Sequence, residues 1–363
     1  MTTIILSRSV QIWRVVQFLV WLVGLAIIFY LIFIPTLGID LVWNVLIPVA
    51  PALLVIATGI WRNVCPLGFT SLLPSRLGFS KKIKLSEKTV SKFNLIGVIA
   101  LLLIVPLRHV ILNTSGLATG ITLMSLGLIV FLVGFFFESK SGWCSGLCPV
   151  HPVEKLYGSK VFFSIPNANC VECFKCVTPC PDSTPGINPL SNKNSDYSRL
   201  AGYIMVGGFP GYIWGWFQVR DYSGMEGLTN LPLIYGYPFI GLLVSLILFW
   251  MVTKVFSKIE NGTIINIFAA LAVSCYYWFR IPNLFGFGFF PADGMLFDLK
   301  GTLPEAIIWT AKISAVLFFF WWLVIRNYNN FSWVIRPAYA KADPVVKTKL
   351  VPTRVRVSEL VDL

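Results

Sequence analysis

Eight long apolar runs constrain this chain more than any other feature of its sequence. They are separated by polar or charged segments and lie at residues 12–35, 41–60, 94–112, 117–137, 201–219, 234–256, 264–281 and 304–325. Each run approaches the ~20 residues that a helix needs to cross a bilayer core of ~30 Å. The composition agrees, because 56% of the residues are hydrophobic and only 12% are charged, unlike soluble globular proteins. The sequence therefore predicts an all-α polytopic membrane protein with about eight transmembrane helices.

Two of these runs need comment. The first exceeds the apolar core of a signal peptide in length and lacks a small-residue cleavage site, so we interpret it as a retained span. The fifth is interrupted by Gly207, Gly208, Pro210 and Gly211. A broken helix beside a cavity and a short hairpin both fit that pattern.

Lysine and arginine gather on one side of this eight-span path. They precede the first run and follow the second, fourth, sixth and eighth. By the positive-inside rule that side is the cytoplasm, and both termini are expected there. We expect a multi-pass protein of a prokaryotic inner (plasma) membrane. Topology explains the net charge of +13, so no nucleic-acid partner is predicted. The basic segment 81–92 is expected either to lie against anionic headgroups of the lipid bilayer or to be a solvated loop.

The cysteines carry the chemistry of the sequence. Between the fourth and fifth runs the chain reads Cys170-Val-Glu-Cys173-Phe-Lys-Cys176-Val-Thr-Pro-Cys180-Pro181, a spacing typical of the loop that binds a [4Fe-4S] cluster in bacterial ferredoxins. Two intervening residues let consecutive thiolates turn onto one cluster. A zinc site, the nearest alternative, usually takes two Cys-x-x-Cys pairs with a longer spacer, and a disulfide is the other alternative. We predict a small ferredoxin-like [4Fe-4S] loop on the cytoplasmic side.

A short internal repeat supplies three more cysteines. The second apolar run ends in Trp61-Arg-Asn-Val-Cys65-Pro66, and the fourth is followed by Cys144-Ser-Gly-Leu-Cys148-Pro149. We interpret these segments as two duplicated hairpins, each ending in Cys-Pro at the cytoplasmic surface. Seven cysteines are then expected on one face, whereas two four-iron clusters need eight thiolates.

The ligand set consequently stays open. Cys170, Cys173 and Cys176 are expected to bind one cluster, with Cys180, Cys65 or Cys148 as the fourth ligand, because the cysteine before proline ligates the other cluster in two-cluster ferredoxins. One cluster is expected and a second is an alternative that would use Cys65, Cys144 and Cys148. A structural role for those three, as small apolar residues at helix ends, is the other alternative.

The chain has only two histidines, His109 and His151. They are expected at opposite membrane surfaces, ~30 Å apart, so one haem cannot use both. His109 is expected either to contact a quinone or another cofactor, or to cap a helix end beside Arg108. His151 is expected either to support the cluster site from outside its ligands or to be a solvated loop residue.

These features divide the chain into four predicted regions. Residues 1–137 form a four-helix membrane region with the two hairpin repeats, and 138–199 form the cytoplasmic Cys-Pro and cluster segment. Residues 200–330 form a second four-helix membrane region. A basic cytoplasmic tail at 331–363 follows, which either adds an edge strand to a partner or stays unstructured.

Together the Cys-Pro hairpins and the four-cysteine motif resemble the membrane-bound polyferredoxin family that includes NapH-type quinol dehydrogenase subunits and the membrane half of NosR-type proteins. The resemblance covers about residues 12–185. It implies electron transfer between the quinone pool and redox partners through [4Fe-4S] clusters that face the cytoplasm. This chain departs from the family in having one ferredoxin motif, Trp61 in place of a cysteine, and about four further spans.

The sequence favours an electron-transfer subunit of an oxidoreductase complex, with other membrane or soluble redox subunits as partners and a quinone as a candidate substrate near residues 207–216. Two alternatives remain. One is an accessory subunit whose cluster only holds the cytoplasmic loop together. The other is an assembly or metal-handling factor in which Cys144 and Cys148 act as exchangeable thiols.

Overall fold

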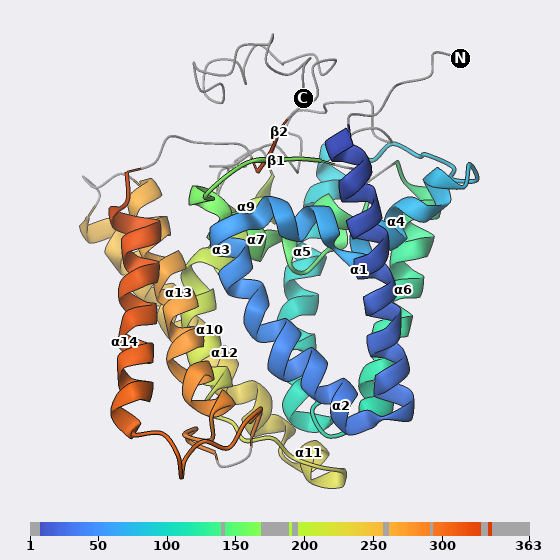
Figure 1. Ribbon diagram of the computed structural model, residues 1–363. Coiled ribbons are helices and arrows are strands. Elements are labelled where there is room, and N and C mark those ends of the chain that lie inside the picture. The colour runs from blue at the N-terminus through green and yellow to red at the C-terminus, as the bar shows by residue number, and fades with distance from the viewer. Residues whose placement is uncertain are drawn as a thin grey trace.

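The computed structural model describes residues 8–138, 142–167, 189–190, 195–256, 261–290, 293–327 and 333–335. These residues form a bundle of long helices that run side by side between two ends (Figure 1). The elements of the first half are α1 (Arg8–Phe33), α2 (Pro35–Ile39), η1 (Asp40–Leu46), α3 (Ile47–Val64), α4 (Pro66–Arg76), α5 (Glu87–Ile104), η2 (Arg108–Leu112), α6 (Gly116–Phe136), η3 (Trp143–Leu147), α7 (His151–Tyr157), η4 (Gly158–Lys160) and β1 (Ile165–Pro166). Those of the second half are α9 (Asp196–Tyr203), η5 (Ile204–Gly208), α10 (Phe209–Trp216), α11 (Met225–Thr229), α12 (Leu231–Val255), α13 (Asn261–Leu284), α14 (Glu305–Phe320), η6 (Trp321–Ile325) and β2 (Val334–Ile335).

Seven helical stretches among the described residues are long and apolar enough to cross a membrane. They are Val10–Phe33, Pro35–Arg76, Glu87–Leu112, Gly116–Phe136, Leu231–Val255, Asn261–Leu284 and Glu305–Ile325. Each overlaps one of the apolar runs in the sequence. The prediction of an all-α, multi-pass membrane protein is therefore confirmed at this level. In the described part of the chain, β1 and β2 form one two-stranded sheet, and a single isolated bridge joins Ile83 to Phe137.

The fifth apolar run behaves differently from the other seven. Residues 196–216 form one continuous helical path through α9, the π-helical turn η5 and α10, so the alternative of a hairpin is wrong. Its glycines bring the backbone close to α12. A side chain at Gly207 would meet Phe249, and one at Gly211 would meet the backbone of Gly241. Small residues are used in this way where two membrane helices approach closely.

The second apolar stretch runs from Pro35 to Arg76, beyond the predicted span 41–60, and it bends twice. Ala57 leaves the helical conformation at φ −148° and ψ 59°, and Cys65 interrupts the helix again before α4. A side chain at Gly59 would collide with the carbonyl oxygen of Trp333. The chain therefore passes very close to the C-terminal strand just after its first bend.

Apolar side chains on α3, α5, α10, α12, α13 and α14 form the main core. The outward faces remain apolar and exposed, as on α1, where Val15 and Phe29 are more than half exposed. Exposed apolar faces of this kind suit contact with lipid chains.

Two ends of the bundle hold the polar features discussed below. The cysteine end contains α4, η3, α7, β1 and β2, whereas the far end contains α2, η2, α11 and the loop between α13 and α14 (Figure 1). Residues beyond Ile335 lie outside the described part of the chain, as does the predicted edge strand of the tail.

Candidate functional site

The two Cys-Pro segments have the same local structure. Cys65 precedes α4 with φ −55° and ψ 120°, and Cys148 follows η3 with φ −62° and ψ 116°. Proline disfavours the α-helical conformation in the residue before it, which explains why both cysteines are extended. The carbonyl of Cys65 then accepts a hydrogen bond from Phe69, and that of Cys148 accepts one from His151. Each cysteine therefore marks a sharp turn at the cysteine end.

Helix packing brings the two segments together. Element α4 of the first hairpin packs against α6 of the second, and α7 of the second packs against α3 of the first. Gly68 lies between the two segments, where an added Cβ would be 3.9 Å from the Sγ of Cys144 and 4.0 Å from the Sγ of Cys65. Cys65 and Cys144, two of the three cysteines predicted to converge, therefore lie close together.

Electrostatics agree with this proximity. Burial raises the pKa of the Cys148 thiol well above its ordinary value, and charges at Glu154, Cys144 and Cys65 would each raise it further. Within the described ranges, no three His, Cys, Asp or Glu side chains are arranged to hold a metal ion. The motif cysteines Cys170, Cys173, Cys176 and Cys180 lie outside the described residues.

A buried ion pair lies beside the three thiols. Arg62, three residues before Cys65, contacts the carboxylate of Glu154, and its Nη1 lies 3.1 Å from Nδ1 of His151. Burial would raise the pKa of Glu154, but Arg62 and His151 hold it below its ordinary value. Burial also lowers the pKa of His151 to about 4, with Lys155 and Arg62 adding to the effect. At neutral pH this group is therefore a carboxylate paired with a guanidinium, beside a neutral imidazole.

The side chain of Trp333, which is far from Arg62 and Glu154 in the sequence, lies over this ion pair. Its ring lies 5.7 Å from the Arg62 guanidinium, and its Nε1 donates a hydrogen bond of 2.7 Å to the carbonyl of Gly158. Directly after it, β2 pairs in parallel with β1, with Val334 opposite Ile165. Residues 333–335 thus complete the cysteine end.

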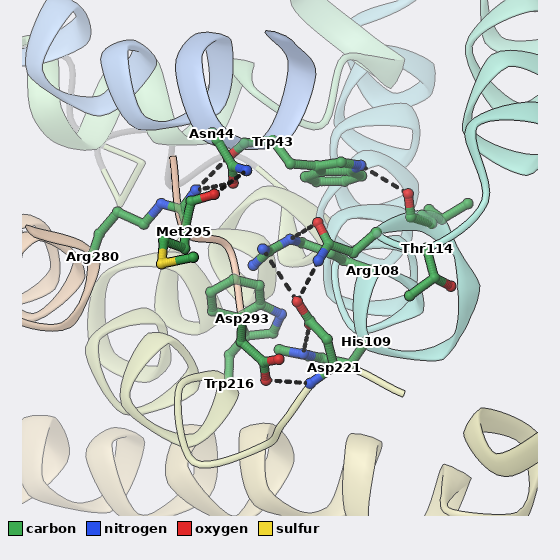
Figure 2. A network of polar contacts seen from close by, with 12 residues as sticks. Trp43, Asn44, Arg108, His109, Thr114, Trp216, Asp221, Arg280, Asp293 and Met295 are labelled. Carbon is green, nitrogen blue, oxygen red and sulfur yellow. Dashed lines mark hydrogen bonds and ion pairs between the residues drawn. The ribbon is translucent and has the colours of Figure 1, made fainter. Parts of the chain in front are cut away.

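The far end holds a second polar cluster, centred on Asp221 (Figure 2). One carboxylate oxygen of Asp221 lies 2.6 Å from Nδ1 of His109. The other contacts Asn113 and lies 3.5 Å from Nη2 of Arg108. The backbone N–H of Asp221 donates a 2.7 Å hydrogen bond to Asp293. Arg108 and His109 hold the pKa of Asp221 below its ordinary value, although burial acts in the opposite direction.

Arg280 adds a second buried guanidinium to the far end. Its side chain is 1% exposed, and its Nη2 donates hydrogen bonds of 2.6 Å to the carbonyl of Trp43 and to Oδ1 of Asn44. The Asn44 amide in turn donates to Asp40 and to the carbonyl of Met295. We name Arg108, His109, Asp221, Arg280 and their contacts the far-end cluster (Figure 2).

The two histidines therefore lie at opposite ends of the bundle, as the sequence predicts. His151 is 1% exposed, so its interpretation as a solvated loop residue is wrong. His109 lies in the last turn of η2, and its side chain is paired with Asp221. Sequence reasoning missed Arg62, Glu154, Asp221 and Arg280 as members of polar clusters. For Glu154 a local signal existed, because it follows His151 by three residues at the start of a short helix.

The stretch considered for a quinone, 207–216, is occupied by helix packing. Gly208 lies against Leu242, and Gly215 lies against the backbone of Tyr237. Trp216 is buried and donates a hydrogen bond to the carbonyl of Val105, whereas Trp214 is 47% exposed. The glycines and Trp216 are thus accounted for by contacts within the bundle.

No protein-family model matches this chain, and neither the curated proteins nor the solved structures that were searched contain a match to it.

Proposed function

We propose that this chain is a membrane electron-transfer subunit that couples the quinone pool, or a partner redox complex, to a [4Fe-4S] cluster held by Cys170, Cys173, Cys176 and Cys180. The spacing of these cysteines supports the cluster, because successive intervals of three residues suit an iron–sulfur loop better than a zinc site. The observation that carries the proposal is the meeting of Cys65, Cys144 and Cys148 at one end of a membrane bundle.

The path of the chain supports a cytoplasmic location for this chemistry. We infer that the helical path 196–216 is an eighth span, in addition to the seven long apolar helices. An even number of spans puts both chain ends on the side of the cysteine end. The lysines and arginines of the connecting segments also belong to that side, which the positive-inside rule assigns to the cytoplasm.

The last described residues before the cluster motif are anchored beside the first Cys-Pro turn. Asn63, two residues before Cys65, donates a 2.9 Å hydrogen bond to the carbonyl of Pro166. The motif begins at Cys170, four residues beyond this anchor. The chain is described again at Pro189 and Leu190, which lie against Gly202 of α9 at the same end.

A bound [4Fe-4S] cluster would supply single-electron transfer at this end. The three converging thiols are one short of the four that a second four-iron cluster takes from cysteine. Cys65, Cys144 and Cys148 would therefore need one further ligand to hold a second cluster. The neighbouring Arg62 and Glu154 would keep the two Cys-Pro turns in place, since Arg62 precedes one turn and Glu154 follows the other.

Metal analysis of anaerobically purified protein tests the proposal. We expect iron and acid-labile sulfide in equal amounts, about four or about eight of each per chain, and an EPR signal after reduction by dithionite. About four would indicate a single relay, and about eight would indicate a second cluster at Cys65, Cys144 and Cys148. Zinc without sulfide would overturn the proposal.

Two cysteine variants separate the cluster from the rest of the bundle. Cys173→Ser should remove the visible absorbance and the EPR signal while leaving membrane insertion intact. Cys275→Ser is the matched control, because Cys275 packs against the apolar core within α13. Absorbance that survives in Cys173→Ser would contradict the assignment.

An accessory subunit whose cluster has a structural role is a second candidate. It is favoured by the apolar surface of the far end, where Phe289 is 78% exposed, Met225 is 75% exposed and Phe297 is 58% exposed. Such side chains suit contact with a partner. Redox titration decides between the two candidates. A cluster whose potential lies far outside the range of quinones, and which no quinol reduces within a turnover time, would favour the structural role.

A further inference from the structure

The connection between α4 and α5, residues 77–86, is tied to the ends of three candidate membrane spans. It follows the stretch Pro35–Arg76 and precedes the stretch Glu87–Leu112. Near its middle, the backbone N–H groups of Lys81 and Ile83 donate hydrogen bonds of 2.7 and 2.9 Å to carbonyls in the last turn of α6. These bonds use carbonyls that a helix end otherwise leaves unpaired. The connection is therefore held at the cysteine end, beside α6 (Figure 1).

The apolar side chains of this connection face outward instead of joining the core. Leu77 is 66% exposed, Phe79 is 44% exposed and Ile83 is 47% exposed. The ring of Phe79 lies 6.1 Å from the rings of Phe131 and Phe135 on α6, a helix whose outward side chains are also apolar and exposed. Apolar groups at the end of a membrane helix suit the boundary between lipid headgroups and lipid chains.

Exposed lysines surround these apolar side chains. Residues 81–92 contain a single acid, Glu87, and five exposed lysines, which are Lys81, Lys82, Lys84, Lys88 and Lys92. Glu138 adjoins the segment through its backbone N–H, which donates to the carbonyl of Ile83, so the lysines outnumber these two acids. Among the residues that the structure describes, none of the five lysines forms an ion pair with a carboxylate. The segment therefore presents a surplus of positive charge to its surroundings.

The position of Lys81 shows how apolar and charged groups share this surface. Its Nζ lies 5.5 Å from the ring of Phe135 and 5.1 Å from that of Phe136, both at the end of α6. A lysine in this position covers apolar surface with its stem and keeps its ammonium group at the polar boundary. The segment thus combines an apolar layer with a positively charged layer at the ends of the spans.

We propose that residues 77–92 form a binding surface for anionic phospholipid headgroups in the leaflet at the cysteine end. The lysine ammonium groups would bind the lipid phosphates, and Leu77, Phe79 and Ile83 would contact the upper part of the lipid chains. Lysine clusters next to a membrane helix suit this chemistry, and each lysine contributes a factor of about five in affinity. The alternative of a solvated loop gives no role to the three exposed apolar side chains. This surface does not depend on the presence of a cluster.

Lipid titration of the full chain in an uncharged detergent tests the proposal. Phosphatidylglycerol is the anionic lipid and phosphatidylcholine is the neutral control. The readouts are the thermal midpoint and the number of bound lipids counted by native mass spectrometry. We expect a saturable rise in the midpoint with phosphatidylglycerol, because a ligand that binds the folded state stabilises it. Glycerol 3-phosphate, a soluble phosphate ester, should not produce this rise because it has no lipid chains.

Paired lysine variants locate the effect. The double variant Lys82→Gln, Lys84→Gln should need about 25-fold more phosphatidylglycerol for the same response, since two lysines are lost. The double variant Lys84→Gln, Lys88→Gln tests the same surface independently. The control is the double variant Lys254→Gln, Lys300→Gln, which removes the same charge from exposed lysines outside the segment. It should bind like the wild type.

The outcomes are distinct. Weaker binding of phosphatidylglycerol in the segment variants, with unchanged binding in the control, supports the surface. Equal responses to the anionic and the neutral lipid would overturn it, and so would equal binding in the segment variants and the control. A rise with glycerol 3-phosphate as large as that with phosphatidylglycerol would show that the lysines bind a free phosphate ester, and would overturn the assignment to lipid. If one segment variant fails to fold, the other decides.

Discussion

The two ends of the bundle each bury an arginine beside a histidine and an acid, yet the two groups are built differently. At the cysteine end, Arg62 contacts Glu154, and a neutral His151 and Trp333 close the group. At the far end, Arg108 pairs with Asp221, whereas Arg280 donates to the carbonyl of Trp43 and to the amide oxygen of Asn44. The first group is therefore closed around one buried ion pair, whereas the second is a wider network of carboxylate, amide and backbone groups.

The strongest test of this contrast removes the acid from the cysteine end. Glu154→Gln leaves the Arg62 guanidinium buried without a counter-charge, so we expect the free energy of unfolding to fall by about 3–5 kcal/mol. Denaturation in detergent measures the change. Glu226→Gln is the control, because its ion pair with Arg220 is about half exposed and should matter by less than about 1 kcal/mol. Equal effects of the two substitutions would show that the cysteine end does not depend on its ion pair.

A smaller effect is expected where Trp333 covers that pair. Trp333→Phe keeps an aromatic ring over Arg62 but loses the hydrogen bond to the carbonyl of Gly158. We expect a loss of about 1–2 kcal/mol in the free energy of unfolding, because the buried carbonyl is left without its donor. Trp321→Phe serves as the control, since Trp321 is 48% exposed. A loss no larger than that of the control would mean that Trp333 does not seal the cysteine end.

The smallest effect concerns pH at the far end. Burial and the charge of Asp221 raise the pKa of Asp293 to about 6, while the hydrogen bond from the Asp221 backbone and the charges of Arg108 and Arg220 oppose this. The folded chain therefore holds this proton at a higher pH than the unfolded chain does. Its contribution makes the free energy of unfolding fall as pH rises from about 4 to about 6, with no further change above.

Asp293→Asn should remove this slope and keep the acceptor for the backbone N–H of Asp221. The change should stay below about 1 kcal/mol because the side chain is only half-buried. Thermal midpoints measured from pH 4 to pH 7 would detect it, with Asp298→Asn as the control. A slope that persists in Asp293→Asn must come from another group.

The comparison also separates what the sequence could predict from what it could not. Seven spans were predictable because a membrane helix needs an uninterrupted apolar run, and such a run is visible locally. The Cys-Pro turns were predictable for the same reason, since the proline that fixes them is the next residue. In the fifth run, the sequence predicted that the glycines interrupt the helix. They instead let α12 pack closely, and the local sequence does not show which helix will be their partner.

The polar clusters depend on partners that are far apart in the sequence. Arg62 and Glu154 are 92 positions apart, and Arg280 and Asn44 are 236 positions apart. No local pattern predicts which helices pack together, so neither pairing could be read from the residues alone. Asp221 gave even less signal, because it lies in a connecting segment without periodicity.

The pairing of Ile165 with Val334 imposes an order on biosynthesis. The ribosome makes β1 long before β2, and at 5–20 residues per second the interval is about 10–30 s. During that time Arg62 lacks its tryptophan cover, and the cysteine end stays open. Insertion of the last helix and arrival of Trp333 then close it. Strand β2 therefore closes the group around Arg62 last.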